Sequence, residues 1–295
     1  MVVMTMMGGL GNQLFQYATG RALSLRLDQP LYLEETGFGK RTQNQEHTYQ
    51  LKCFMHKAIP LKGGHWARVK ARLGWSSMLG TLLKKDGAVG FSEPPGSSFK
   101  EEVMQLSSPV HLRGHFMSFR YFDEIRSTLL EDLCLEAPLS ERSKRWADEA
   151  SRTSSVSIHY RRGDFVSNPS VAKSVEGILT ETYYRNAVDE IMGTIENPHF
   201  YVFSNDMPWV KKNVSLPGKV TFVEGNGSDR GYEDLWVMSR CRHHILAGGS
   251  TFSWWAAYLN PREDKKVIRT EKVNNEEDYN YPDDFFPPSW KSVPS

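Results

Sequence analysis

The chain has 295 residues, a formal net charge of +1 and 24% charged residues. This balance excludes a global attraction to nucleic acid or to an anionic membrane, so any anion site must be built locally. The length is enough for two domains of ordinary size. Three widely spaced cysteines form neither a metal-binding pair nor a disulfide framework, which points to a reducing cytoplasm.

The chain opens with a predicted strand, helix and strand. Residues 2–7 are an apolar run without a basic residue, too short for a signal-peptide core or a membrane span, so we predict a first β-strand. A glycine-rich turn follows at 8–11, and Asn12 is the predicted N-cap of a helix over 12–27, whose apolar side chains recur at helical spacing. Residues 31–33 are the next predicted strand, which completes a βαβ unit.

The rest of the chain predicts two domains. In the first half we expect a loop over 87–108, a strand over 110–116 and a helix over 121–133, with a domain junction near Ala137. In the second half the predicted strands are 156–159, 199–203, 220–223, 244–247 and 266–268, and the predicted helices are 181–192, 206–213, 231–241 and 250–259. Such alternation is typical of parallel sheets. We therefore predict an α/β protein with two Rossmann-like, doubly wound domains, 1–137 and 138–295, that face a central cleft.

Two adjacent arginines follow the apolar strand that ends near Ile158. Arg161 and Arg162 lie in the sequence His-Tyr-Arg-Arg-Gly-Asp at 159–164, where the strand runs into a glycine turn. A guanidinium group presents a rigid fork of donors that matches phosphate oxygens, and open α/β sheets bind ligands outside the carboxyl ends of their strands. We therefore predict a clamp for a diphosphate. The alternative is a surface arginine pair balanced by Asp164.

The N-terminal glycine turn also precedes a helix, whose first turn attracts anions. Taken alone, it fits an NAD(P)-dependent oxidoreductase in which Glu34, at the end of the second strand, grips a ribose. A dinucleotide fingerprint built from Gly9 and Gly11 requires Gly or Ala three residues later, however, where Leu14 stands. That interpretation also leaves the arginine pair without a role. A tight turn with no ligand is the other alternative.

Polar side chains follow two further predicted strands. Ser204, Asn205 and Asp206 end one of them, and a carboxylate there can accept from the N1–H and N2 amino group of guanine; helix capping by the same residues is the alternative. Ser250 and Thr251 follow two glycines at a predicted helix N-terminus and can donate hydrogen bonds to one phosphate. Both turns are therefore candidate parts of a nucleotide site.

The sequence offers few metal ligands but several candidate carboxylates. Glu233 and Asp234 open a predicted helix, where acids complement the dipole; such a carboxylate can also accept a proton. His243 and His244 are adjacent, which is not metal-ligand spacing, and no Asp-x-Asp pair occurs anywhere. We therefore expect arginines and helix termini, rather than a cation, to neutralise a bound diphosphate.

Several ordered motifs together resemble a known family. They are the opening sequence at 8–17, the arginine motif at 159–164, the Phe-Ser-Asn-Asp motif at 203–206, and the segments 234–239 and 250–255. Together they resemble the inverting α-1,2-fucosyltransferases of glycosyltransferase family eleven, bacterial branch, from Met6 to about Asn260. One departure is Gly-Gly at 248–249, where relatives often carry Ala-Asn. It leaves the hydroxyl groups of Ser250 and Thr251 in place, and we expect it to change the stiffness of the loop.

The resemblance implies a GT-B-like fold and GDP-L-fucose as the donor, with no metal and no other cofactor. The implied reaction moves L-fucose from GDP-β-L-fucose to the 2-hydroxyl of a terminal β-galactoside, of the lactose, lacto-N-biose or O-antigen type, with inversion to an α-1,2 linkage. Because no apolar run in the sequence approaches the length of a membrane span, we expect a cytoplasmic bacterial enzyme without a transmembrane segment, with or without peripheral association at the inner face of the membrane. A non-catalytic nucleotide-sugar-binding module is the alternative that keeps the phosphate clamp without turnover.

The resemblance also implies roles for single residues. Arg161 should hold the β-phosphate, and Arg162 and Asp164 should shape the fucose side or brace Arg161. The implied donor-binding residues, mostly in the C-terminal domain, are Gly11, Asn12, His159, Arg161, Ser204, Asn205, Asp206, Ser250, Thr251 and Ser253. The candidate acceptor-binding residues, in the N-terminal domain, are Arg113, His115 and Arg120. The predicted catalytic residues are Arg161, Arg162, Asp164 and Glu233, of which the two carboxylates are the candidate proton acceptors.

Overall fold

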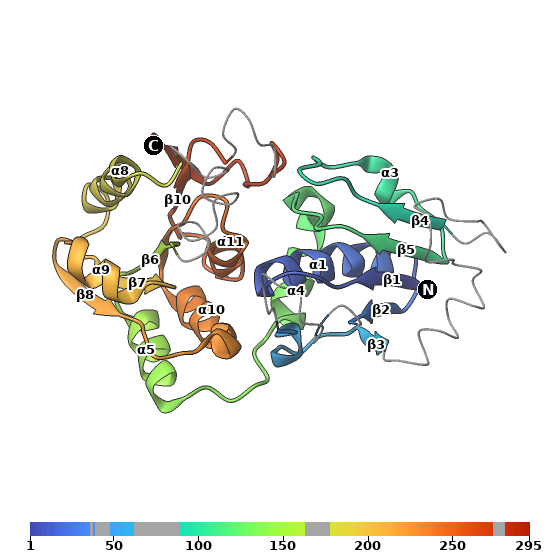
Figure 1. Ribbon diagram of the computed structural model, residues 1–295, viewed down its shortest axis with the longest axis horizontal. Coiled ribbons are helices and arrows are strands. Elements are labelled where there is room, and N and C mark those ends of the chain that lie inside the picture. Colours follow the sequence, from blue (N-terminus) through green and yellow to red (C-terminus); the bar gives the residue numbers. More distant parts are fainter. Residues whose placement is uncertain (36–37, 39–47, 62–88, 163–177, 274–280) are drawn as a thin grey trace. The chain divides into compact units, whose positions relative to one another are not determined.

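The computed structural model describes residues 1–295 except 36–37, 39–47, 62–88, 163–177 and 274–280. The chain divides into two compact units (Figure 1). The N-terminal unit comprises Met1–Glu136 and Pro282–Phe286, and the C-terminal unit comprises Ala137–Tyr281 and Pro287–Ser295. A short segment near the carboxyl end of the chain therefore belongs to the N-terminal unit, and the last residues return to the C-terminal one.

The N-terminal unit is built on a parallel sheet of five strands in the order β3-β2-β1-β5-β4. The strands are β1 (Val2–Thr5), β2 (Leu31–Glu34), β3 (Ile59–Leu61), β4 (Val89–Ser92) and β5 (Val110–Arg113). The chain proceeds outward from β1 to β3 on one side and places β5 and β4 on the other. The sheet therefore reverses direction between β1 and β5, and the loops that leave these two strands diverge at their carboxyl ends.

Helix α1 (Leu10–Arg26) is almost wholly buried and packs against β1 and β2. It is joined to α4 (Arg126–Asp132) through Asp132, whose Oδ2 accepts hydrogen bonds from Tyr17 Oη and Arg21 Nε, each at 2.7 Å. The segment Pro282–Phe286 adds Phe285, whose fully buried ring stacks on Phe15 of α1 at 5.9 Å. The unit also contains α3 (Glu101–Met104) and three 3₁₀ turns, η1 (Leu51–Cys53), η2 (Phe119–Tyr121) and η3 (Asp123–Ile125).

The C-terminal unit has a parallel sheet of six strands in the order β11-β10-β9-β6-β7-β8. The strands are β6 (Ser155–Tyr160), β7 (His199–Ser204), β8 (Lys219–Phe222), β9 (His243–Ile245), β10 (Val267–Thr270) and β11 (Lys291–Val293). Counted from β6, this is the doubly wound order 3-2-1-4-5-6 that is common among dinucleotide-binding domains. Its reversal lies between β6 and β9.

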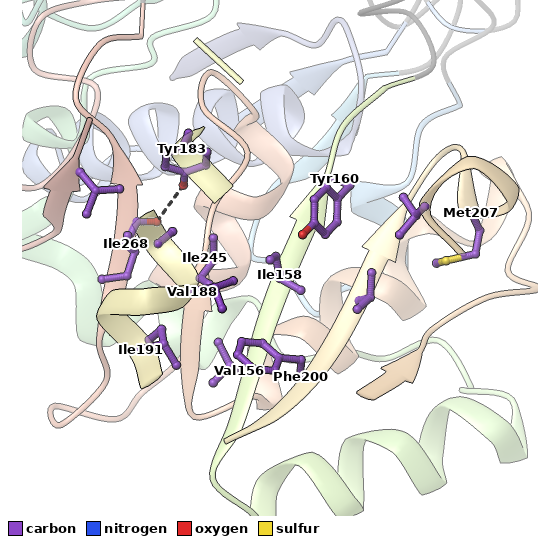
Figure 2. Close-up of a cluster of buried hydrophobic side chains, with 14 residues drawn as sticks. Val156, Ile158, Tyr160, Tyr183, Val188, Ile191, Phe200, Met207, Ile245 and Ile268 are labelled. Carbon is purple, nitrogen blue, oxygen red and sulfur yellow. Dashed lines mark hydrogen bonds between the residues drawn. The ribbon is translucent and has the colours of Figure 1, made fainter. Parts of the chain in front are cut away.

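The helices of this unit cover both faces of the sheet. Helices α8 (Glu181–Met192) and α9 (Met207–Asn213) lie on one side, and α5 (Glu141–Arg152), α10 (Gly231–Arg240) and α11 (Thr251–Tyr258) pack together on the other (Figure 1). Figure 2 shows the core under α8, where Val188 and Ile191 face apolar side chains of the central strands. Tyr183 Oη donates to the carbonyl oxygens of Leu246 and Ile268, at 2.5 and 3.4 Å, and so fixes α8 to the sheet.

The structure confirms the predicted α/β class with two parallel sheets, but several element boundaries were wrong. Helix α1 begins at Leu10, because Gly8 turns the chain with a φ of +76° and Gly9 is the N-cap. Asn12 is therefore not the cap; it lies in the first turn, so close that a Cβ on Gly8 would be 2.6 Å from its Nδ2. The predicted loop 87–108 contains β4 and α3. None of the described helices is long and apolar enough to cross a membrane.

Candidate active site

The arginine motif and the Ser-Thr turn meet at the carboxyl edge of the C-terminal sheet. Strand β6 ends at Tyr160 and leads into Arg161, and β9 leads through two glycines into Ser250 at the start of α11. His159 Nδ1 and Ser250 Oγ lie 3.5 Å apart across the two strand ends. These strands flank the point where the strand order reverses, which is where open α/β sheets bind their ligands. The sequence prediction that both turns serve one site is consistent with this geometry.

The hydroxyl groups at the start of α11 differ in their surroundings. Ser250 is the N-cap, with its Oγ accepting from the backbone of Ser253 at 3.5 Å. Ser253 is fully buried, and its own Oγ accepts from the backbone N–H of Ala247 at 3.2 Å. This hydrogen bond fixes the turn between β9 and α11. Thr251 is half-buried. The first turn of α11 therefore places a helix N-terminus, with Thr251 as its first residue, at this edge of the sheet.

His159 is buried beside this turn and is electrically neutral. Burial and the positive charge of Arg161 lower the pKa of its imidazole to about 3, so the ring is uncharged at any physiological pH. Its ring lies 6.0 Å from that of Phe252 on α11. His159 can therefore contribute a hydrogen bond to a ligand but no charge. The fixed positive charge at this edge comes from the arginines that follow it.

Arg162 is held by the turn that follows β7. Its guanidinium group lies 3.5 Å from the ring centroid of Trp209, and its Nε is 3.4 Å from Asp206 Oδ2. Its backbone N–H donates to Asn205 Oδ1 at 2.8 Å. The backbone around 161–162 is thereby fixed to the neighbouring strand, whereas Arg161 itself is half-buried at the carboxyl end of β6. The two arginines thus have different surroundings, and Arg162 is the one tied to the β7 turn.

Asp206 acts as a helix cap in the structure. Its Oδ1 accepts from the backbone N–H of Trp209 at 3.3 Å, and Ser204 Oγ accepts from the N–H of Asp206 at 3.0 Å. The capping alternative of the sequence analysis is therefore present. Recognition of guanine by Asp206 stays a prediction: Oδ1 caps the helix and Oδ2 lies near Arg162 Nε, but each carboxylate oxygen can accept a second hydrogen bond.

The two carboxylates predicted as proton acceptors differ in what the structure describes. Asp164 lies outside the described residues. Glu233 is fully buried; its Oε2 accepts from Ser140 Oγ at 2.7 Å and from the Ser140 backbone N–H at 3.2 Å, while its Oε1 accepts from the guanidinium group of Arg230. Glu233 thus joins the start of α10 to the start of α5. We infer that it stabilises the fold rather than accepting a proton from substrate.

The N-terminal unit has its own strand reversal, and a glutamine spans it. Gln16 of α1 is fully buried; its Oε1 accepts from the backbone N–H of Met7 after β1, and its Nε2 donates to the carbonyl of Gly114 after β5, each at 3.0 Å. Gln13 binds the carbonyl oxygens of Gly8 and Thr48, both at 2.9 Å. Sequence reasoning missed both glutamines. The sequence feature that could have indicated them is the presence of two amide side chains among the apolar positions of a predicted helix.

The candidate acceptor residues lie at or after the end of β5 in the N-terminal unit. Arg113 is exposed at the end of the strand, and burial lowers the pKa of the half-buried His115 below its usual range. The guanidinium group of Arg120 lies 4.4 Å from the ring centroid of Phe99 and 3.9 Å from Asp284 Oδ2. Their roles in binding an acceptor stay predictions.

Glu34 is buried at the carboxyl end of β2. The oxidoreductase alternative depended on this residue to bind a ribose. Glu34 Oε2 accepts from Thr5 Oγ1 at 2.9 Å, and Thr5 Oγ1 also lies 2.8 Å from His111 Nε2. The Glu34 side chain is thus hydrogen-bonded to Thr5 of the neighbouring strand β1, which in turn contacts His111 of β5. This arrangement gives the oxidoreductase alternative no support.

Comparison with known proteins identifies the family. The model of the family described as Glycosyl transferase family 11 matches residues 70–293. The chain belongs to this family. The resemblance inferred from the motifs is therefore confirmed, and the protein is a glycosyltransferase.

Relatives extend over most of the chain. An Escherichia coli alpha-1,2-colitosyltransferase is 32% identical over 275 residues, which are 88% of this chain and 87% of the relative. The Escherichia coli O-antigen biosynthesis glycosyltransferase WbnK is 29% identical over 289 residues, 90% of this chain and 92% of the relative. The Bos taurus galactoside alpha-(1,2)-fucosyltransferase 2 is 33% identical over 158 residues, 51% of this chain and 45% of the relative.

Two solved structures share the fold. The NodZ alpha-1,6-fucosyltransferase soaked with GDP-fucose matches with a TM-score of 0.52 at 12% identity, covering 93% of this chain and 96% of that one. A mutant of Arabidopsis thaliana FUT1 in complex with GDP matches with a TM-score of 0.52 at 12% identity, covering 92% of this chain and 71% of that one. The likeness confirms the predicted GT-B-like fold class.

Gly248, in the turn before Ser250, leaves no room for a side chain. A Cβ on Gly248 would lie 2.5 Å from Thr270 Oγ1 and 2.8 Å from Thr270 Cγ2. We therefore expect Gly248→Ala to lower the free energy of unfolding by about 1–3 kcal/mol, because the added methyl group overpacks the buried site. Thr270→Ala removes both atoms, so the double variant should recover part of this loss. Urea unfolding of the four proteins measures the coupling, and strictly additive effects would contradict the steric explanation.

Proposed function

We propose that this protein transfers L-fucose from GDP-β-L-fucose to the 2-hydroxyl of a terminal β-galactoside, with inversion and without a metal ion. Membership of glycosyl transferase family 11 supports the transferase chemistry. The observation that carries the nucleotide site is the meeting of the arginine motif and the Ser250 turn at the reversal between β6 and β9. Sites at such reversals bind nucleotides in doubly wound sheets.

The proposed chemistry follows from where charge develops. As the bond between fucose and the β-phosphate breaks, positive charge grows on the sugar and negative charge on the departing diphosphate. Arg161 and the N-terminus of α11 supply fixed positive potential at the carboxyl edge of the sheet, which stabilises the leaving group more in the transition state than in the ground state. Arg162, held by Asp206 and Trp209, keeps the backbone of Arg161 in place.

The donor sugar has a second candidate. The relative that is 32% identical over most of this chain is a colitosyltransferase, so GDP-colitose belongs in any donor test. The acceptor side is proposed to lie in the N-terminal unit, at the carboxyl ends of β4 and β5. Among the described residues, no group of three or more His, Cys, Asp and Glu side chains could hold a metal ion.

Ligand binding and transfer test the proposal together. We expect GDP, but not UDP or NAD, to raise the melting temperature in EDTA; at 100 times its Kd, GDP should add about 2.7 kcal/mol to the free energy of unfolding. Incubation of GDP-fucose or GDP-colitose with lactose or lacto-N-biose should then give an α-1,2-linked product, identified by NMR. Stabilisation by NAD alone would favour the oxidoreductase. Binding of GDP without transfer to any galactoside would favour a binding module.

A further inference from the structure

A half-buried carboxylate lies at the end of β4 in the N-terminal unit. Glu93 follows this strand directly, and its Oε2 accepts from the backbone N–H of Phe116 at 2.5 Å; the backbone N–H of His115 also interacts with the carboxylate. The turn that donates these hydrogen bonds has Gly114 at φ +156°, where a Cβ would lie 2.5 Å from the Cβ of Glu93. A glycine at 114 therefore makes room for the carboxylate against the backbone that orients it.

The same turn is fixed to the reversal point of the N-terminal sheet. Gln16 holds the carbonyl of Gly114 with one end of its amide group and the N–H of Met7 with the other. The loops after β1 and β5 are thereby joined, and Glu93 on β4 is attached to the second of them. The carboxylate thus has a defined position beside the place where an open α/β sheet binds a ligand.

One oxygen of this carboxylate has no partner. Glu93 Oε1 is buried and makes no hydrogen bond within the part of the chain that the structure describes. Asp284, whose charge acts on Glu93, shows the same pattern. Its Oδ2 accepts from the N–H of Phe99 at 3.0 Å, and its buried Oδ1 has no partner among the described residues. Buried polar atoms are almost always hydrogen-bonded, so such an oxygen is suited to a donor that arrives with a ligand. A sugar hydroxyl group is a donor of that kind.

We propose that Glu93 is the proton acceptor of the transfer reaction; this inference rests on the fucosyltransferase function proposed above. The acceptor's 2-hydroxyl oxygen forms a bond to C1 of fucose while the bond from C1 to the β-phosphate oxygen breaks. The bonding electrons leave with GDP, and the hydroxyl proton passes to Glu93 Oε1, from which it is returned to solvent. Oε2 remains hydrogen-bonded to the backbone N–H of Phe116 throughout, which keeps the carboxylate oriented.

The electrostatics of the cluster suit this role. Burial raises the pKa of Glu93 to about 7, and the negative charge of Asp284 adds to the increase, whereas the two backbone N–H groups and Lys100 oppose it. Other titratable or charged groups of the surrounding turns include Tyr121, His115, Arg120 and Arg113, which lies opposite Ser92 at the end of β4. A general base is most effective when its pKa lies near the working pH. Because the ionised form accepts the proton, kcat should rise as the pH increases through about 7.

Glu93→Gln is the direct test. Glutamine retains a carbonyl oxygen for the backbone N–H groups of 115 and 116 but cannot accept the proton. We expect kcat to fall at least ~100-fold, with the affinity for GDP unchanged by calorimetry and without the rise in kcat near neutral pH. Glu102→Gln makes the same chemical change at an exposed position of α3 and should leave kcat and its pH profile as in the wild type. Asp284→Asn should move the acid limb of the wild-type profile to lower pH.

The outcomes separate this inference from the proposed function. A Glu93→Gln enzyme with kcat within tenfold of the wild type, or with a defect only in the acceptor KM, would overturn the role of Glu93. A wild-type protein that binds GDP but fucosylates no galactoside would overturn the function instead. If Glu93→Gln does not fold, the dependence of the wild-type kcat on pH decides. An increase in kcat near neutral pH that moves to lower pH in Asp284→Asn supports the inference, and the absence of such an increase overturns it.

Discussion

Replacing Arg161 by alanine is expected to lower kcat at least ~100-fold while the protein remains folded. Arg161 leaves the carboxyl end of β6 and is half-buried at the reversal of the C-terminal sheet. Its neighbour His159 is neutral there, and Arg162 is engaged by Asp206 and Trp209. Removing Arg161 therefore takes away the fixed charge that most directly opposes the charge of the departing diphosphate. Because that charge grows in the transition state, the loss should appear in kcat more than in the KM for GDP-fucose.

Steady-state kinetics on Arg161→Ala, with thermal unfolding as a check on the fold, measures this effect. Arg152→Ala is the matched control, because Arg152 is an exposed residue in the last turn of α5 in the same unit. It should behave as the wild type in both measurements. Arg161→Lys should recover only part of the rate, since an ammonium group lacks the paired donors of a guanidinium. Turnover near the wild-type rate in Arg161→Ala would remove this residue from the mechanism.

The sequence predicts the central strands far better than the edges of the sheets. Strands β6 and β7 are buried on both faces, so their residues form apolar runs that can be recognised directly. Strand β4 is an edge strand with only half-buried or exposed residues, and it lies in a segment rich in Gly, Ser and Pro, which is typical of a loop. The edge strand β11 was missed as well. The edge strand β8 was predicted over 220–223, because that segment is an apolar, β-branched run; β4 and β11 lack such a run, and their pairing with a neighbouring strand leaves no mark on the local sequence.

Some residues of the candidate site could likewise be predicted from the sequence and others could not. Arg161 and Ser250 could be predicted because they directly follow apolar strands, and the topology of doubly wound sheets brings such residues to one edge. Gln16 and Glu93 act through contacts with residues 98 and 23 positions away, so neither could be assigned from its neighbours in sequence. Glu233 illustrates the opposite case. Its place at the start of a helix is compatible with catalysis, and only its complete burial against Ser140, 93 residues away, indicates a structural role.

That structural role makes Glu233→Ala the substitution with the largest expected effect on stability. Removing one partner of a buried ion pair typically costs about 3–5 kcal/mol, because the other polar groups are left unpaired. Arg230 is 42% exposed and can regain water, whereas the hydroxyl and N–H of Ser140 lose their acceptor at the start of α5. We therefore expect a loss of about 3 kcal/mol in the free energy of unfolding, at the lower end of this range.

Urea unfolding and kinetics at low temperature together separate the two roles of Glu233. Glu224→Ala is the matched control, since Glu224 forms an exposed ion pair with Lys211 at 2.6 Å and should cost less than about 1 kcal/mol. If Glu233 only joins α10 to α5, the folded fraction of Glu233→Ala should turn over within a few-fold of the wild-type rate. A variant that keeps its stability but loses transfer ~100-fold would instead restore Glu233 as the proton acceptor, and the burial argument made here would then be wrong.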